Sequence, residues 1–219
     1  MADAQTVPDY IVVEGPIGVG KTTLSRRLAA DLDAMLMLEQ VDDNPFLPHF
    51  YSRREQMALP TQLHFLLDRV DQIEQMRALT PAGQRVVADY LLAKDFLFAS
   101  LNLDEAELAL YQRLYQRLAS QMPQPDLVVY LQAPVSVLLE RVAGRGRHFE
   151  RSMDSTYLAR LSDAYANFFH YYEESPLLVV NAGEIDFAGN QYDYQALFDE
   201  ILSTRSGRRF FNPLPENRL

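Results

Sequence analysis

The chain has 219 residues, 48% of them hydrophobic and 23% charged, and a formal net charge of −10. That length can bury a core of ordinary size, while the acidic balance argues against a general nucleic-acid binder, which needs a broad basic face. There is no cysteine, which excludes disulfides, thiolate metal sites and a cysteine nucleophile. We see neither a signal peptide in the opening MADAQTVPDY nor an apolar run long enough for a bilayer, and expect one cytoplasmic domain over residues 1–219.

The first predicted elements are a strand and a helix. YIVVE, residues 10–14, is short, apolar and rich in β-branched residues, which is typical of a buried strand. KTTLSRRLAADL, residues 21–32, repeats leucine at helical spacing and predicts a helix with one apolar face. A glycine-rich segment connects the two.

This segment, EGPIGVGKTT, fits the pattern G-x-x-x-x-G-K-[ST] in the context of strand and helix that the pattern requires. Glycines let backbone N–H groups turn toward an anion, and the helix N-terminus adds partial positive charge. Lys21 would reach the terminal phosphates of ATP, and Thr22 would offer its hydroxyl to Mg²⁺. A glycine turn that binds nothing is the disfavoured alternative. The residues expected to bind the nucleotide here are Gly15, Gly18, Gly20, Lys21, Thr22 and Thr23.

AMLMLE, residues 34–39, predicts a second strand that ends at Glu39. Ligands bind at the carboxyl ends of parallel strands, so this carboxylate is a candidate to accept the proton of an attacking hydroxyl. A solvated acid in an acidic loop is equally compatible with its position. Just beyond it, Asn44 followed by Pro45 is typical of a helix start.

PTQLHFLLDRVDQIEQMRAL, residues 60–79, predicts a long amphipathic helix. Gln62 and Arg69 are seven residues apart and share a face with Leu66 and Ile73. Polar groups on such a face need partners, and a flat heterocycle with hydrogen-bonding edges is one candidate. The alternative is that Arg69 reaches solvent or pairs with an acid, and the residues alone favour that alternative.

QRVVADY, residues 84–90, predicts a third strand, with Asp89 at its end. That carboxylate is placed to hold Mg²⁺, directly or through water, or to cap a helix. The elements predicted next are helices at 93–101 and 104–121, a strand at 126–132 and a helix at 135–143.

Arg141, Arg145 and Arg147 fall within seven residues of one another, among glycines. A charge run usually lies on a solvated face. Arginines without lysine, separated by glycines, favour instead a lid over residues 143–152 that brings positive charge to transferring phosphates.

A helix at 153–172, a strand at 176–182 and a helix at 192–204 complete the pattern, and the basic, aromatic residues 205–219 form a tail that we expect to dock on its own domain. Strands alternating with helices predict an α/β fold with a five-stranded parallel sheet covered on both faces.

Together these segments resemble the deoxynucleoside kinase family, especially its bacterial deoxyadenosine and deoxyguanosine kinases. The resemblance runs from about Tyr10 to Leu202 and is most specific in EGPIGVGKTT, EQVDDNPFL, FYSRREQMALPTQ, VVADY and RVAGRGRHFE. It implies a P-loop kinase fold, ATP and Mg²⁺, and transfer of the γ-phosphoryl group to the 5′-hydroxyl of a deoxynucleoside in nucleotide salvage. It also implies a homodimer through paired helices, for which residues 104–121 are the candidate segment.

The resemblance implies individual roles as well. Glu39 matches the general base for the 5′-hydroxyl, and Tyr51 matches the tyrosine that binds the 3′-hydroxyl, with Glu150 as its carboxylate partner. Gln62 matches a base-reading glutamine and Arg69 a second, variable base-contacting position. The lid arginines and the metal-side acid match Arg141, Arg145, Arg147 and Asp89.

One departure concerns the residue after the third strand. Many members have an acid followed by Arg-Ser, whereas here Asp89 is followed by Tyr90, as in the Asp-Tyr pattern of bacterial purine-deoxynucleoside kinases. Lys94, one of only two lysines, is a candidate substitute for the arginine.

We therefore predict a deoxynucleoside kinase in which Lys21, Mg²⁺ and the lid arginines neutralise the transferring group. One alternative is a thymidylate-type nucleotide kinase, which would need cations for the phosphate of its acceptor where this chain has Glu39 and Tyr51. A non-catalytic subunit of the same fold is a second alternative, which the intact glycine segment, Glu39 and the lid oppose. The residues leave purine against pyrimidine preference open.

Overall fold

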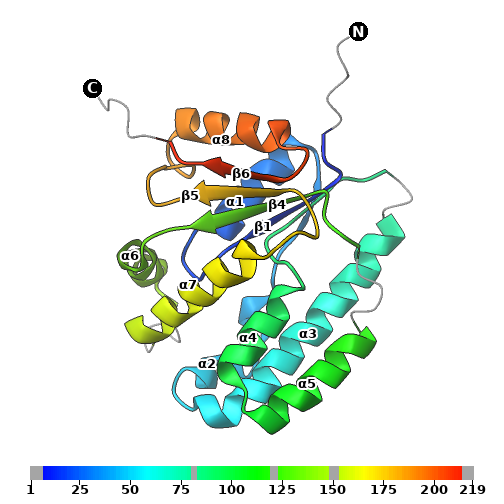
Figure 1. The fold of residues 1–219 in the computed structure, drawn as a ribbon, viewed down its shortest axis with the longest axis vertical. Helices are drawn as coiled ribbons and strands as arrows, with labels where there is room; N and C mark the ends of the chain where they lie inside the picture. The colour runs from blue at the N-terminus through cyan, green and yellow to red at the C-terminus, as the bar shows by residue number, and fades with distance from the viewer. Residues whose placement is uncertain (1–6, 80–82, 119–122, 148–152, 214–219) are drawn as a thin grey trace.

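The computed structural model describes residues 7–79, 83–118, 123–147 and 153–213. Six strands form one sheet in the order β2-β3-β1-β4-β5-β6, and each neighbouring pair is parallel. Figure 1 shows the arrowheads of β4 and β5 pointing to the same side. The strands are β1 (Tyr10–Glu14), β2 (Met35–Met37), β3 (Val86–Ala88), β4 (Leu127–Gln132), β5 (Leu177–Asn181) and β6 (Arg208–Phe211).

The core lies on both faces of the central strands. In β1 the residues from Ile11 to Glu14 are fully buried, and so are nearly all residues of β4. A parallel sheet covered on both faces needs continuous apolar strands, which is why these runs could be recognised from the sequence.

Helices connect the strands. Figure 1 shows α7 in front of the sheet, α1 behind it, and α3, α4 and α5 grouped below. Within the described residues, no helix has both the length and the apolar composition needed to cross a membrane. The helices are α1 (Lys21–Asp31), α2 (Leu47–Phe50), α3 (Arg54–Leu79), α4 (Lys94–Asn102), α5 (Glu105–Leu118), α6 (Val135–Arg145), α7 (Ser155–His170) and α8 (Gln191–Ser203), with a 3₁₀ turn η1 (Val41–Asp43).

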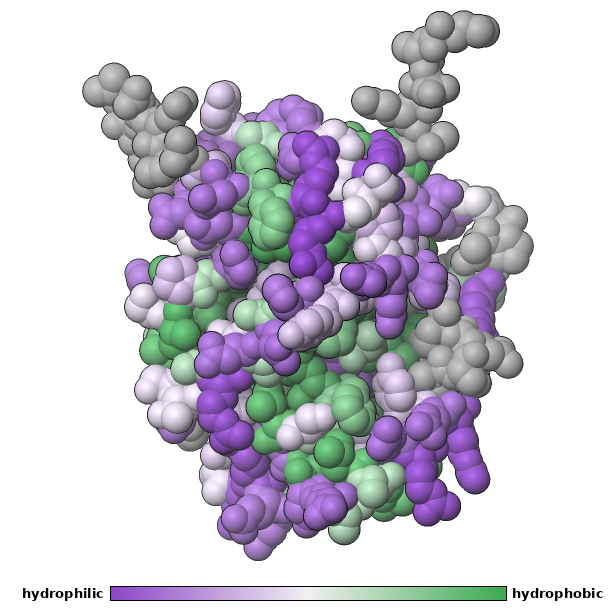
Figure 2. Space-filling view, viewed as in Figure 1, coloured by the Kyte–Doolittle hydropathy of each residue, from purple (hydrophilic) through white to green (hydrophobic). Residues whose placement is uncertain are grey.

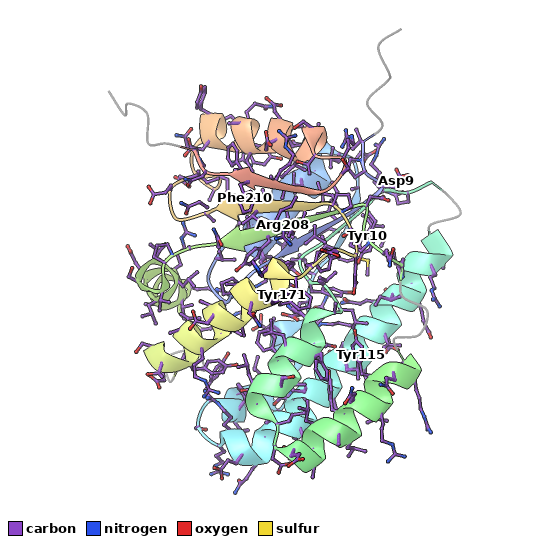
Figure 3. All side chains as sticks on the ribbon, viewed as in Figure 1. Asp9, Tyr10, Tyr115, Tyr171, Arg208 and Phe210 are labelled. Carbon is purple, nitrogen blue, oxygen red and sulfur yellow. The ribbon has the colours of Figure 1, made fainter. Side chains whose placement is uncertain are left out.

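The prediction of five strands is wrong by one, because the tail contributes β6 beside β5. Arg208 anchors this strand by donating to the carbonyls of Phe169, His170 and Tyr172 at 2.9, 2.9 and 3.2 Å. Phe169 and His170 end α7, whose last carbonyls need donors from outside the helix, and Tyr172 follows two residues later. Figure 3 shows Arg208 below β6, close to Tyr171. An exposed edge strand such as RRFF has no apolar pattern that would reveal it.

Two predicted helix starts are also wrong. Pro45 does not begin a helix: the Asn44 side chain accepts from the Phe46 N–H at 3.0 Å and donates to the Thr61 carbonyl at 3.1 Å, forming a turn before α2. The long helix begins at Arg54, so Pro60 lies inside it instead of at its start. A further difference concerns the end of α6. This helix includes residues 143–145 and stops at Gly146, which has a φ of 72°. The first part of the predicted lid is therefore helical.

Candidate active site

The site lies at the carboxyl ends of β1, β2 and β3. The glycine segment follows β1, Glu39 follows β2 by two residues, and Asp89 directly follows β3. A cavity of about 790 Å³ opens at this edge. The predicted residues that line it are Gly18, Gly20, Lys21, Thr22, Thr23, Glu39, Tyr51, Gln62, Arg69, Asp89, Arg141, Arg145 and Arg147.

Of the remaining predicted residues, Gly15 is buried and does not line the cavity, and Glu150 lies outside the described residues. The predicted pair of Tyr51 and Glu150 stays a prediction.

The glycine segment packs too closely for side chains. A Cβ at Gly15 would lie 2.3 Å from the Leu131 carbonyl oxygen, and one at Gly20 would lie 2.8 Å from the Phe187 ring. Both have positive φ, 150° and 110°, which side chains disfavour. Gly20 also precedes α1 without a side-chain cap, so the first N–H groups of the helix have no side-chain acceptor from the N-cap.

Lys21 folds back over this segment. Its ammonium donates to the Gly15 carbonyl at 2.7 Å and approaches that of Pro16 at 3.4 Å. Burial, and next the charge of Lys94, lower the pKa of Lys21 below its ordinary value, although nearby acids act in the opposite direction. An anion in the cavity would therefore gain a poorly solvated cation as its partner.

Asp89 joins two segments of the site. Its carboxylate accepts from the Thr22 hydroxyl at 2.6 Å and from the Glu39 N–H at 2.7 Å. Burial raises the pKa of Asp89, while the hydrogen bond from Thr22 acts against that. The N-cap of α4 is Ala93, so the alternative of Asp89 as a cap for that helix is wrong.

Glu39 faces three cations. Arg69 forms an ion pair with its Oε1, and the Lys94 ammonium lies 3.4 Å from the same oxygen. Burial tends to raise the pKa of Glu39, but Lys94, Arg69 and Lys21 outweigh it and hold that pKa far below its usual range. The side chain is therefore a carboxylate at neutral pH, able to accept a hydrogen bond.

Gln62 and Arg69 both face the cavity from α3, and both are nearly buried. Arg69 also forms an ion pair with Asp95, a fully buried residue of α4. Arg69 thus pairs with acids, as the alternative interpretation expected, and its contact with a base stays a prediction. No hydrogen bond joins the Gln62 amide to another described residue, and the side chain lines the cavity, so the amide is available to a ligand.

The arginines near the end of α6 differ in what they do. Arg141 donates to the carbonyls of Val19 at 3.1 Å and Ala182 at 2.9 Å, and so ties the glycine segment to the end of β5. Arg147 forms an ion pair with Asp42 at 2.9 Å. Residues 148–152 of the predicted lid lie outside the described residues.

Sequence reasoning missed two buried acids, Asp95 and Glu14. Glu14 ends β1 and accepts from the N–H groups of Gly15 at 2.8 Å and Leu91 at 2.7 Å, and from the Tyr165 hydroxyl at 3.0 Å. For Asp95 a signal did exist, because charged residues interrupt the apolar stretch YLLAKDFLF. Among the described residues, no group of three or more histidines, cysteines or acids forms a separate metal centre.

Comparison with known proteins identifies the family of this chain. A family model described as deoxynucleoside kinase matches residues 11–204. The chain is 32% identical over 193 residues to a deoxyguanosine kinase of Bacillus subtilis, covering 86% of this chain and 93% of the relative. It is 31% identical over 205 residues to a deoxyadenosine kinase of Lactobacillus acidophilus, covering 87% of this chain and 94% of the relative.

A solved structure of deoxyadenosine kinase from M. mycoides with bound dATP has a similar fold. The TM-score is 0.77 at 24% identity, over 88% of this chain and 98% of the other.

Proposed function

Because the chain belongs to the deoxynucleoside kinase family and is a phosphotransferase, we propose that it transfers the γ-phosphoryl group of ATP to the 5′-hydroxyl of a purine deoxynucleoside. Relatives named deoxyguanosine kinase and deoxyadenosine kinase support a purine acceptor. The observation that carries the proposal is one cavity in which the glycine segment and Glu39 meet, with Gln62 and Arg69 lining it as well.

On the donor side, we assign the glycine segment as the phosphate-binding P-loop. Its uncapped helix start and Lys21 would bind the phosphates. Arg145 and Arg147 would form the part of a lid that approaches the transferring group, since both line the cavity. Arg141 would hold the P-loop in place, because its guanidinium already bonds two backbone carbonyls.

On the acceptor side, Glu39 would accept the proton of the 5′-hydroxyl. Tyr51 lines the cavity beside Tyr157 and would contact the sugar. Gln62 and Arg69 would bind the base, because both side chains line the cavity. Most of the rate enhancement would come from positioning and charge neutralisation, as is general for phosphoryl transfer.

The residues present fit a magnesium ion. Mg²⁺ is usually held by one or two protein oxygen ligands together with phosphates and water, and the paired oxygens of Thr22 and Asp89 supply such a set. When bound, the ion would neutralise negative charge on the phosphates.

We also propose a homodimer and a single domain over residues 1–219 that acts in the cytoplasm. Strands from Tyr10 to Phe211 share one sheet, which supports the single domain. Figure 2 shows apolar side chains gathered where α4 and α5 lie in Figure 1. On these helices the side chains of Phe96, Leu110 and Leu118 are 38%, 46% and 36% exposed, and exposed apolar patches often mark interfaces between proteins. Light scattering would measure the oligomeric state.

ATP consumption by the purified protein with Mg²⁺ tests the function. Each of the four deoxynucleosides and each of their monophosphates is offered separately. Turnover on deoxyadenosine or deoxyguanosine is expected. Turnover on monophosphates alone would make it a nucleotide kinase, and no turnover with ATP bound would make it a non-catalytic subunit.

Glu39→Gln is the matching variant. It should lose about 10²–10⁴-fold in kcat, whereas Asp43→Asn, an exposed acid four residues away that does not line the cavity, should retain wild-type activity. Full activity of Glu39→Gln would refute the assigned base.

A further inference from the structure

Lys94 is a lysine buried between two acids, one at the end of β1 and the other two residues after β2. Its side chain is 2% exposed, and its ammonium lies 3.5 Å from Oε2 of Glu14 and 3.4 Å from Oε1 of Glu39. Removing an ammonium and its carboxylates from water costs free energy that their pairing does not always restore, so a buried triad of charges is weak evidence for stability and a reason to look for a function.

The two acids are held very differently. Glu14 is fully buried and receives hydrogen bonds from two backbone N–H groups and from Tyr165, which fix both of its oxygens. Glu39 follows a strand of three residues, and its side chain is 17% exposed at the cavity. Lys94 thus connects an immobile carboxylate to the one that faces the cavity.

The backbone of Lys94 is fixed as well. It begins α4, and its N–H donates to the Leu91 carbonyl at 3.1 Å. The N–H of Leu91 itself donates to Glu14. The same loop therefore positions both the lysine and its buried anchor.

Arg69 touches the same oxygen of Glu39 but has another attachment. Its guanidinium also pairs with Asp95, and it lines the cavity beside Gln62. A ligand that recruits Arg69 would leave Lys94 as the cation held against Glu39.

We propose that Lys94 is a positioning residue for phosphoryl transfer: anchored on Glu14, its ammonium orients the Glu39 carboxylate toward the acceptor hydroxyl. This inference rests on the proposed role of Glu39 as the base. Loss of Lys94 would leave Glu39 paired with Arg69 alone, without the link to the fixed Glu14, and would lower the rate without weakening ATP binding.

A double-mutant cycle tests this, because residues that act through one another are not additive. Lys94→Gln should lower kcat by about 10²-fold and leave KM for ATP within about three-fold. In the Glu39→Gln background the same substitution should cost less than about three-fold. Lys94→Arg, which keeps the charge, should recover part of the rate. Arg209→Gln removes an ion-paired arginine on β6 and should leave kcat unchanged.

Three outcomes would overturn the proposal. They are a wild-type kcat for Lys94→Gln, a loss of kcat from Lys94→Gln that is as large in the Glu39→Gln background as in the wild type, and no recovery of kcat by Lys94→Arg. If Glu39→Gln is inactive while Lys94→Gln is fully active, this inference falls and the proposed function stands. If Glu39→Gln keeps full activity, the assigned base and this inference fall together.

Lys94→Gln leaves Glu14 buried without its cation, so a second variant covers a failure to fold. Glu14→Gln with Lys94→Gln removes both buried charges together and should show the same loss of kcat.

A measurement without any change at Lys94 is also possible, since the chain has only two lysines. Labelling lysine at ¹⁵Nζ gives two signals, and the one that Lys21→Arg leaves in place should shift on Glu39→Gln. An unshifted signal would contradict the contact.

Discussion

Thr22 and Asp89 are 67 positions apart in the sequence, and a hydrogen bond of 2.6 Å joins the hydroxyl of the first to the carboxylate of the second. Thr22 is the second residue of α1, at the end of the glycine segment, and Asp89 directly follows β3. Because β1 and β3 are neighbours in the sheet, their carboxyl ends place these oxygens together at the cavity.

Thr22→Val removes this hydroxyl with little change in shape. If Thr22 and Asp89 hold Mg²⁺, the Mg²⁺ concentration for half-maximal activity should rise about ten-fold or more. Thr156→Val, at an exposed threonine in the first turn of α7 that does not line the cavity, is the control. Identical Mg²⁺ titrations of Thr22→Val and the wild type would contradict the assignment.

Asp95→Asn tests the pairing that holds Arg69. The variant should lose about 10–100-fold in kcat/KM for the deoxynucleoside, because the buried guanidinium loses one of its two carboxylates and its orientation in the cavity. KM for ATP should stay unchanged. The control variant is Asp71→Asn, at an exposed acid of α3, which should keep wild-type kinetics. If Asp95→Asn lowers kcat/KM equally for ATP and for the deoxynucleoside, general unfolding explains the loss instead.

Gly15→Ala should destabilise the fold by about 2 kcal/mol or more. The added Cβ would lie 2.3 Å from a backbone carbonyl, which cannot move aside, at a φ that alanine disfavours. Gly144→Ala has open space and a helical position in α6, and should be neutral or more stable by about 0.5–1 kcal/mol. Urea unfolding measures both, and equal midpoints for the two variants would refute the close packing.

The dependence of stability on pH should show whether Glu39 is held as a carboxylate in the folded protein. Its cations lower its pKa in the folded protein below the ordinary value of 4.5, so the folded state binds fewer protons than the unfolded chain as the pH falls through that value. The stability that Glu39 contributes is therefore present at neutral pH and is lost progressively below about pH 5.

The wild type should thus lose more stability than Glu39→Gln between about pH 6 and about pH 3. Urea unfolding midpoints of both proteins, measured at several pH values in this range, give the difference in stability between the wild type and Glu39→Gln. This difference should shrink as the pH falls. Parallel curves would show that the carboxylate is not held in its charged form.

Local patterns in the sequence determined much of the fold. Buried parallel strands such as β1 and β4 are apolar throughout, and the glycine segment needs its residues at fixed spacing, so short windows contain both signals. The residues Glu39, Asp89, Gln62 and Arg69 could be proposed because strand ends and helix faces position side chains in a regular way.

Only the tertiary structure decided the rest. β6 pairs through its backbone and carries exposed side chains, so nothing in RRFF distinguishes it from a loop. The buried charges of Glu14, Lys94 and Asp95 are stable only because segments far apart in sequence neutralise one another. A charged residue in a sequence is expected to be exposed to solvent. Burial of such a residue is stable only when the fold brings it an oppositely charged partner, and the sequence does not show which residue that is.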